Sequence, residues 1–127
     1  MMSKATPKKA KWPAAFRLVN ELGLRFPNVE AAIRYDGSPV LKADGVFMAG
    51  IARHASAEPD TLVIRIGLEE RAGLLEDAPE AYYVTEHYRR FPVVLVRLKA
   101  VTREVLGELL AGSWRIAAAK GRRGRPY

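Results

Sequence analysis

The sequence predicts an α+β domain in which helices pack on one face of a mostly antiparallel sheet. Three observations lead to this fold class. The hydrophobic period changes several times along the chain, which argues against an all-helical or all-strand architecture. Asp44-Gly45 is a strong signal for a two-residue hairpin, and such a hairpin joins antiparallel strands. The chain of 127 residues is long enough for a single hydrophobic core.

The first half of the chain predicts one helix and three antiparallel strands. Pro13 suits a first helical turn, and apolar residues with helical spacing follow until Pro27 stops the pattern. Alternation then begins, and its apolar positions, which include Ile33 and Tyr35, predict a half-buried strand. The expected segments are a helix at 13–26 and strands at 29–35, 40–42 and 46–53, with a turn at 36–38.

The second half predicts the remaining strands and two helices. Thr102 can cap the last helix, whose buried stripe runs from Leu106 to Ala117. Residues 85–92 are polar and aromatic and are expected to form an extended link. The other expected segments are a strand at 62–66, a helix at 68–78 and strands at 82–84 and 93–98. The complete order is α-β-β-β-β-α-β-β-α.

The net charge of +7 is concentrated at the two ends of the chain. Residues 12–119 hold 13 basic and 14 acidic side chains, so this body is nearly neutral. Each flanking segment carries four Lys or Arg residues and no acid. Because both are poor in apolar residues, neither buries enough surface to offset its ordering entropy. We therefore expect a basic arm at 1–11, a folded domain at 12–119 and a basic tail at 120–127, with both ends disordered in the absence of a partner.

Composition excludes several functional classes. The absence of cysteine excludes a disulfide scaffold, a thiolate zinc site and a cysteine nucleophile. No apolar run approaches the roughly 20 residues that a membrane span requires. The N-terminus is polar and basic without a following apolar stretch, so no signal peptide is expected. A cytoplasmic monomer that does not contact membranes is the resulting prediction.

Several sequence blocks occur in an order that is typical of one family. They are Phe26-Pro27-Asn28-Val29-Glu30, Tyr35-Asp36-Gly37-Ser38-Pro39, Thr61-Leu62-Val63-Ile64-Arg65, Tyr82-Tyr83-Val84-Thr85-Glu86-His87-Tyr88 and Val94-Leu95-Val96-Arg97-Leu98. Over roughly residues 14–119 the chain resembles the MmcQ/YjbR family of small bacterial proteins. The resemblance implies a frataxin-like (CyaY-like) fold, often described as a double-wing DNA-binding domain, without a catalytic residue to carry over.

One segment departs from that family. After His87 the family commonly has aromatic-Gly-aromatic-Pro-Trp, whereas this chain has Arg89-Arg90-Phe91-Pro92-Val93. Two arginines at this place favour contact with phosphates over aromatic stacking. Tyr88 and Phe91 are expected to pack in the core or in a turn rather than to stack on bases.

The C-terminal tail contains Arg123-Gly124-Arg125-Pro126, which resembles the core of the AT-hook. In such a peptide, glycine lets the backbone approach the groove floor, and extended arginines lie in the narrow minor groove of A·T-rich DNA. At the other end, Thr6-Pro7-Lys8-Lys9 is similar to the Ser/Thr-Pro-Lys-Lys units of linker-histone tails. The predicted nucleic-acid contacts are Lys8, Lys9, Lys11, Arg89, Arg90, Lys120, Arg122, Arg123, Gly124, Arg125 and Pro126. The alternative is that both ends only aid solubility.

Basic residues are also spread along the predicted strands and hairpin links of the body. If several share one face, they would extend the footprint of the two arms, although isolated strand arginines are commonly solvated or paired with Glu. These residues are Arg34, Lys42, Arg53, Arg65, Arg89, Arg90, Arg97 and Lys99.

Catalysis and metal binding find little support in the sequence. His54 and His87 are the only histidines, and neither belongs to a metalloprotease motif. On an extended chain, Glu86 and His87 would point to opposite faces and could not form an acid/base pair. A frataxin-like iron role is rejected because the first helix holds only one acid, Glu21. We expect no cofactor and no metal.

Three functional hypotheses follow. The first is a non-enzymatic protein that binds double-stranded DNA with weak sequence specificity, its arms favouring A·T-rich minor grooves. The second is a protein- or small-ligand-binding domain whose basic tails serve solubility only. The third is an enzyme that uses the loop around His87.

Overall fold

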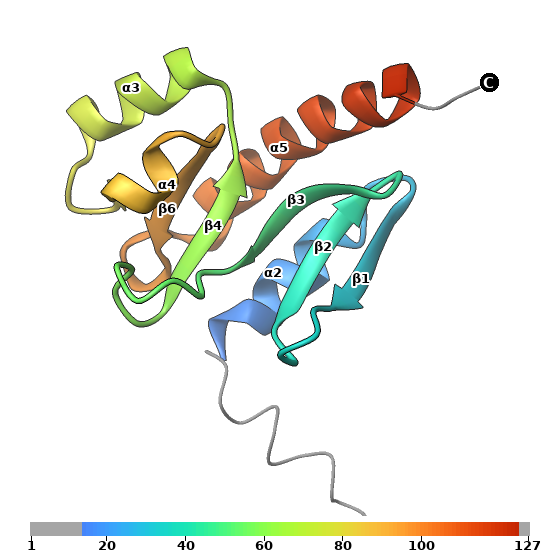
Figure 1. The fold of residues 1–127 in the computed structure, drawn as a ribbon, viewed down its shortest axis with the longest axis horizontal. Helices are drawn as coiled ribbons and strands as arrows, with labels where there is room; N and C mark the ends of the chain where they lie inside the picture. The colour runs from blue at the N-terminus through green and yellow to red at the C-terminus, as the bar shows by residue number, and fades with distance from the viewer. Residues whose placement is uncertain (1–13, 125–127) are drawn as a thin grey trace, which may run out of the picture.

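The structure, a computed structural model, describes residues 14–124 and consists of one six-stranded sheet with helices on it (Figure 1). The strand order is β1-β2-β3-β4-β6-β5, and every neighbouring pair is antiparallel. The predicted α+β class with an antiparallel sheet is therefore confirmed. The elements are α2 (Ala15–Gly23), β1 (Val29–Ile33), β2 (Pro39–Ala43), β3 (Val46–Ile51), β4 (Thr61–Arg65), α3 (Leu68–Asp77), β5 (Tyr82–Tyr83), α4 (Glu86–Arg89), β6 (Val93–Arg97), the 3₁₀ helix η1 (Leu98–Ala100) and α5 (Arg103–Gly124).

Helices α2 and α5 contact each other and cover one face of the sheet (Figure 1). The main core lies between them and the strands, where Val19 of α2, Leu62 of β4 and Leu110 of α5 are fully buried. The predicted cap of α5 is present, because the N–H of Val105 donates to Oγ1 of Thr102 at 3.1 Å. This face contains most of the apolar surface that the folded chain removes from water.

The opposite face of the sheet carries a second, smaller core. Val63 of β4 and Leu95 of β6 point to this side, while their sequence neighbours point into the main core. Tyr88 of α4 packs on them, so one helix lies on the face that was expected to carry none. The extended link predicted at 85–92 is wrong, because a helix of four residues is too short to display a helical period in the sequence.

Helix α5 is longer than the sequence predicted. It continues to Gly124, past the domain boundary expected at 119 and through the first five residues of the expected tail. Gly121 is buried where α5 crosses the β2–β3 turn, and a Cβ there would lie 2.8 Å from the Cβ of Asp44 and 3.3 Å from its carbonyl oxygen. Only glycine permits this approach, so packing against the hairpin accounts for the extra turn.

The prediction for the β2–β3 hairpin turn is confirmed, whereas the prediction for the edge strand β1 is partly wrong. Asp44 and Gly45 have φ values of 50° and 81°, as a two-residue hairpin turn requires, which confirms the predicted turn. The half-buried face expected at 29–35 is wrong at its far end, because Ile33 is 69% exposed and Tyr35 is 97% exposed. Strand β1 lies at the edge of the sheet and has only β2 as a neighbour, which leaves its end uncovered.

Candidate functional site

The residues predicted to contact nucleic acid are divided among separate parts of the molecule. Arg89 ends α4 and Arg90 follows it, and both side chains are exposed. Lys120 is exposed on α5, which also includes Arg122, Arg123 and Gly124. Helices α4 and α5 lie on opposite faces of the sheet, so the structure does not bring these two groups into one cluster. The other predicted residues, Lys8, Lys9, Lys11, Arg125 and Pro126, lie outside the described residues.

Several strand cations occupy the face opposite α2 and α5. The guanidinium of Arg34 lies 5.8 Å from the ring centroid of Phe47, and that of Arg97 lies 4.3 Å from the ring centroid of Tyr83. Both rings pack against the second core, which places both arginines on its side of the sheet. Alternation along the strands adds Lys42 and Arg65 to the same face.

Arg97 and Lys99 are engaged in ion pairs. Nη2 of Arg97 lies 2.7 Å from a carboxylate oxygen of Glu58, and Nζ of Lys99 lies 3.4 Å from Asp60. The hydrogen bonds from Arg97 lower the pKa of Glu58 and raise the pKa of the guanidinium itself. Charge on this face is therefore partly neutralised by the chain's own acids.

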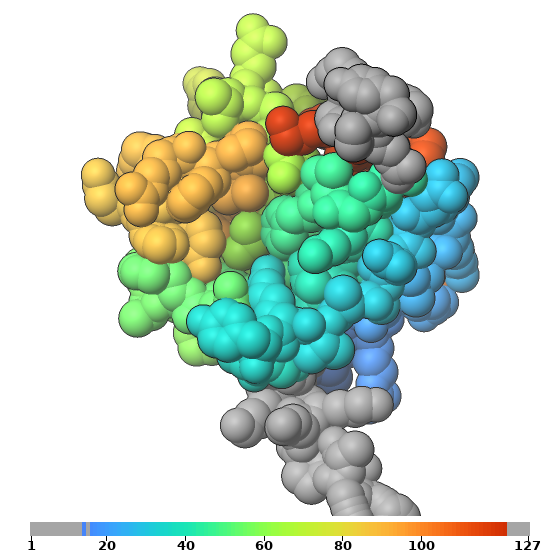
Figure 2. Space-filling model, turned by 45° about the vertical axis from the view of Figure 1, so that its right-hand side comes forward, coloured from blue at the N-terminus to red at the C-terminus, as the bar shows by residue number. Residues whose placement is uncertain are grey.

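A cleft of about 390 Å³ opens on this second face, between the β1–β2 turn and α4. In the space-filling view the surface is hollowed between the cyan turn and the orange segment that contains α4 (Figure 2). Its lining comes from four parts of the chain that the sheet and α4 bring together. The lining residues are Arg34, Tyr35, Asp36, Ile51, Arg53, His54, Val63, His87 and Tyr88.

Arg34 forms one wall of the cleft and is half-buried. Its Nη1 donates to the hydroxyl of Ser38 at 3.1 Å and to the carbonyl oxygen of Ile51 at 3.0 Å. Its Nε and Nη2 donate to no acceptor within residues 14–124, and no carboxylate there lies within 4.0 Å of it. Burial, followed by repulsion from Arg53, lowers the pKa of the Arg34 guanidinium.

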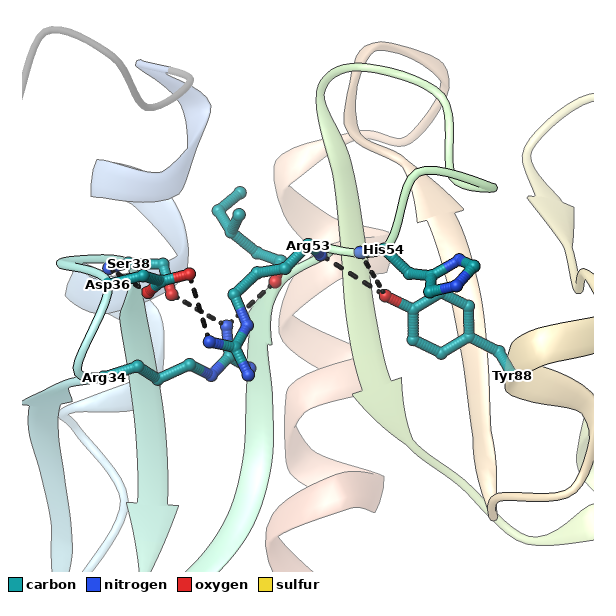
Figure 3. A network of polar contacts seen from close by, with 7 residues as sticks. Arg34, Asp36, Ser38, Arg53, His54 and Tyr88 are labelled. Carbon is teal, nitrogen blue, oxygen red and sulfur yellow. Dashed lines mark hydrogen bonds and ion pairs between the residues drawn. The ribbon is translucent and has the colours of Figure 1, made fainter.

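Asp36, the single acid that lines the cleft, forms an ion pair with Arg53 (Figure 3). Oδ2 of Asp36 lies 3.0 Å from Nη1 of Arg53, and Oδ1 accepts a hydrogen bond of 2.9 Å from the N–H of Ser38. The hydrogen bonds from Ser38, with help from Arg53, hold the pKa of Asp36 at about 2. Asp36 is therefore ionised at neutral pH, and the two arginines leave the cleft with a net positive charge.

An aromatic wall faces the arginines (Figure 3). The hydroxyl oxygen of Tyr88 accepts hydrogen bonds from the backbone N–H groups of Arg53 at 3.3 Å and His54 at 3.1 Å. The rings of His54 and His87 stack with centroids 3.7 Å apart and an interplanar angle of 8°. Desolvation, His54 and the cation Arg90 lower the pKa of His87, which favours its neutral form.

Sequence reasoning missed this histidine pair. His54 and His87 are far apart in the chain, and the polar link that holds His87 was expected to be extended. Helix α4 instead places His87 against His54 in the loop after β3. The next residue, Tyr88, accepts a hydrogen bond from the backbone N–H of His54 in the same loop. A polar segment with one histidine gives no periodic signal, so only the tertiary structure shows the pairing.

A second cavity of about 320 Å³ lies on the other face, between α3, α5 and β4. Its lining is mainly apolar and includes Leu74, Tyr82 and Leu109, with Glu70 and Glu108 among its polar members. In the part of the chain that the structure describes, no three acidic, histidine or cysteine side chains gather as a metal site would require. Within the same residues, no helix is both long and apolar enough to cross a membrane.

Comparison with known proteins supports the fold. No family model matches the chain. Uncharacterized proteins of Mycobacterium bovis and Mycobacterium tuberculosis are 28% identical to it over 85 residues, which is 65% of this chain and 64% of each of those proteins. The crystal structure of the Deinococcus radiodurans protein DR2400, which has a DUF419 domain, is similar with a TM-score of 0.66 and 23% identity, over 81% of this chain and 78% of that one. The structural neighbour is thus a DUF419 domain protein.

Proposed function

We propose that the chain is a non-enzymatic DNA-binding protein of the MmcQ/YjbR type, with weak sequence specificity. The observation that carries this proposal is the pair of exposed arginines at the end of α4, Arg89 and Arg90, beside a sheet face that also holds Arg34 and Lys42. The guanidinium of Arg90 lies 5.3 Å from the ring centroid of Phe91, which restricts where it points. Exposed guanidinium groups without acidic partners are the groups that contact DNA phosphates.

The two ends of the chain complete the proposed interaction. Each carries four positive charges, and their Arg-Gly-Arg-Pro and Thr-Pro-Lys-Lys segments suit narrow A·T-rich minor grooves. The partner is double-stranded DNA, bound mainly through its phosphates. Affinity then falls steeply with salt, since every neutralised phosphate releases bound counterions.

The test is fluorescence anisotropy with A·T-rich and G·C-rich duplexes at several salt concentrations. The variant R89Q/R90Q is compared with R17Q/R115Q, which removes the same charge from exposed positions on α2 and α5. We expect R89Q/R90Q to reduce the log–log salt slope by up to about 0.9 for each lost phosphate contact, while R17Q/R115Q leaves it near the original value. Equal slopes for the two variants would overturn a role for α4.

The contribution of the C-terminal end to DNA binding is tested by substituting its basic residues rather than by deleting them. A cut after residue 119 would remove Gly121, which packs on the β2–β3 turn, and would confuse folding with binding. The variant K120Q/R122Q/R123Q/R125Q keeps that glycine, and we expect it to lose the A·T preference. A chain that binds both duplexes equally before and after this change would support the alternative, a protein- or small-ligand-binding domain with solubilising tails.

A further inference from the structure

The cleft contains a half-buried guanidinium, and among residues 14–124 the lining holds two arginines but one acid. Asp36 is its one acid, and the ion pair with Arg53 engages that acid at 3.0 Å. Arg34 has only neutral oxygens at Nη1, and its Nε and Nη2 lack acceptors within residues 14–124. A guanidinium withdrawn from water without an opposite charge is costly, and an anion from outside would relieve that cost.

The vacant donors suit an anion with several oxygens. Nε and Nη2 of an arginine form a parallel fork that two oxygens of one anion can accept. The Tyr88 hydroxyl already accepts two backbone N–H groups, and its own proton has no acceptor among the described residues. Arg34 and Tyr88 both line the cleft, and the fork and the hydroxyl together offer three donors that have no acceptor among the described residues, which matches the three terminal oxygens of a phosphate monoester.

We propose that the cleft between the β1–β2 turn and α4 binds a phosphate monoester of nucleotide size, with Arg34 as the principal ligand of the phosphate group. The volume of about 390 Å³ lies in the range of small-molecule sites and exceeds the need of a bare ion. A phosphodiester inside a duplex has two unesterified oxygens, and its flanking sugars would have to enter the cleft with it. This proposal goes beyond DNA binding by the exposed arginines and does not depend on it.

Phosphate monoesters occur on free nucleotides and at the ends of nucleic acids, and titration separates these two sources. Isothermal titration calorimetry is performed on the full chain with inorganic phosphate, a 5′-mononucleotide, the matching nucleoside, and short duplexes with either 5′-phosphate or 5′-hydroxyl ends. We expect the mononucleotide to bind and the nucleoside not to bind. Binding of the phosphorylated duplex alone would assign the site to nucleic-acid ends. If neither phosphorylated ligand binds, or if the nucleoside binds as well as the nucleotide, the proposal is overturned.

Two cleft variants and one control locate the site. R34Q removes the fork, and Y88F removes the hydroxyl donor but keeps the ring. R115Q removes an exposed charge on α5, away from the cleft. We expect R34Q to weaken binding of the mononucleotide by about tenfold or more and Y88F by less, since one bidentate charged contact outweighs one neutral hydrogen bond.

NMR spectra provide a second measurement. Added mononucleotide should shift the ring signals of His54 and His87 in the parent chain and in the control R115Q. Unchanged affinity in both R34Q and Y88F, when circular dichroism shows both to be folded, would contradict the assignment. The DNA-binding proposal is judged separately by R89Q/R90Q, so one proposal can fail while the other stands.

Discussion

Replacing Tyr88 by Phe tests whether one hydroxyl holds the cleft together. The change keeps the buried ring but removes the oxygen that accepts the N–H groups of Arg53 and His54, at 3.3 and 3.1 Å. Each neutral hydrogen bond contributes about 0.5–1.5 kcal/mol net, so two lost bonds cost about 1–3 kcal/mol. Because both residues are exposed, water can replace part of the loss, and we expect Y88F to lower the free energy of unfolding by about 1–2 kcal/mol.

The assay is urea denaturation followed by far-UV circular dichroism, and the control is Y35F. Tyr35 lines the same cleft but is 97% exposed, and within residues 14–124 its hydroxyl makes no hydrogen bond. We expect Y35F to change stability by less than about 0.5 kcal/mol. The slope with urea should stay the same in both variants, because neither alters the surface exposed on unfolding. The reasoning is refuted if Y88F is no more destabilising than Y35F.

Two further predictions concern the same cleft. A Cβ at Gly50 would overlap Nη2 of Arg34 and lie 3.1 Å from its Cζ, so G50A should displace the guanidinium and weaken mononucleotide binding by about tenfold. The flexible side chain can move, so stability should change by less than about 1.5 kcal/mol in urea titrations, and undiminished binding would contradict the prediction. Desolvation, His54 and Arg90 lower the pKa of His87 below 6.5, so the unfolded chain binds more protons than the folded one as pH falls from that value. The free energy of unfolding should therefore decrease as the pH falls from 6.5 through the lowered pKa of His87, because protonation favours the unfolded chain. The urea midpoint of H87Q should depend less on pH in this window than that of the parent chain.

Local patterns predicted those parts of the fold that local physics determines. The alternation at 62–66 and the apolar segment at 93–98 indicated two strands, and β4 and β6 pair with each other inside the sheet, each with a neighbour on both sides. Asp44-Gly45 predicted the hairpin because few residues tolerate positive φ at both turn positions. Thr102 predicted the start of α5 because a hydroxyl can accept the N–H of the residue three positions on.

The candidate cleft could not be predicted in the same way. Its walls come from the β1–β2 turn, the end of β3 with the loop after it, and α4, and their proximity depends on the order of strands in the sheet. Asp36 pairs with Arg53, so Arg34 has no ion pair among residues 14–124, and no spacing in the sequence distinguishes the two arginines. The stacking of His87 on His54 gave no signal in the sequence, because the link around His87 was expected to be extended where α4 forms a turn of helix.

The extension of α5 changes where a DNA-binding segment can begin. Composition placed the boundary after residue 119, yet the fit of Gly121 against the β2–β3 turn keeps the helix in place beyond that point. The AT-hook-like Arg123-Gly124-Arg125-Pro126 has its first two residues in the last turn of α5, whereas insertion into a minor groove requires an extended backbone. Only residues 122–124 need leave the helix, and helix ends open at a free-energy cost near zero. The proposed groove contact is therefore compatible with the fold, provided that the helix remains anchored at Gly121.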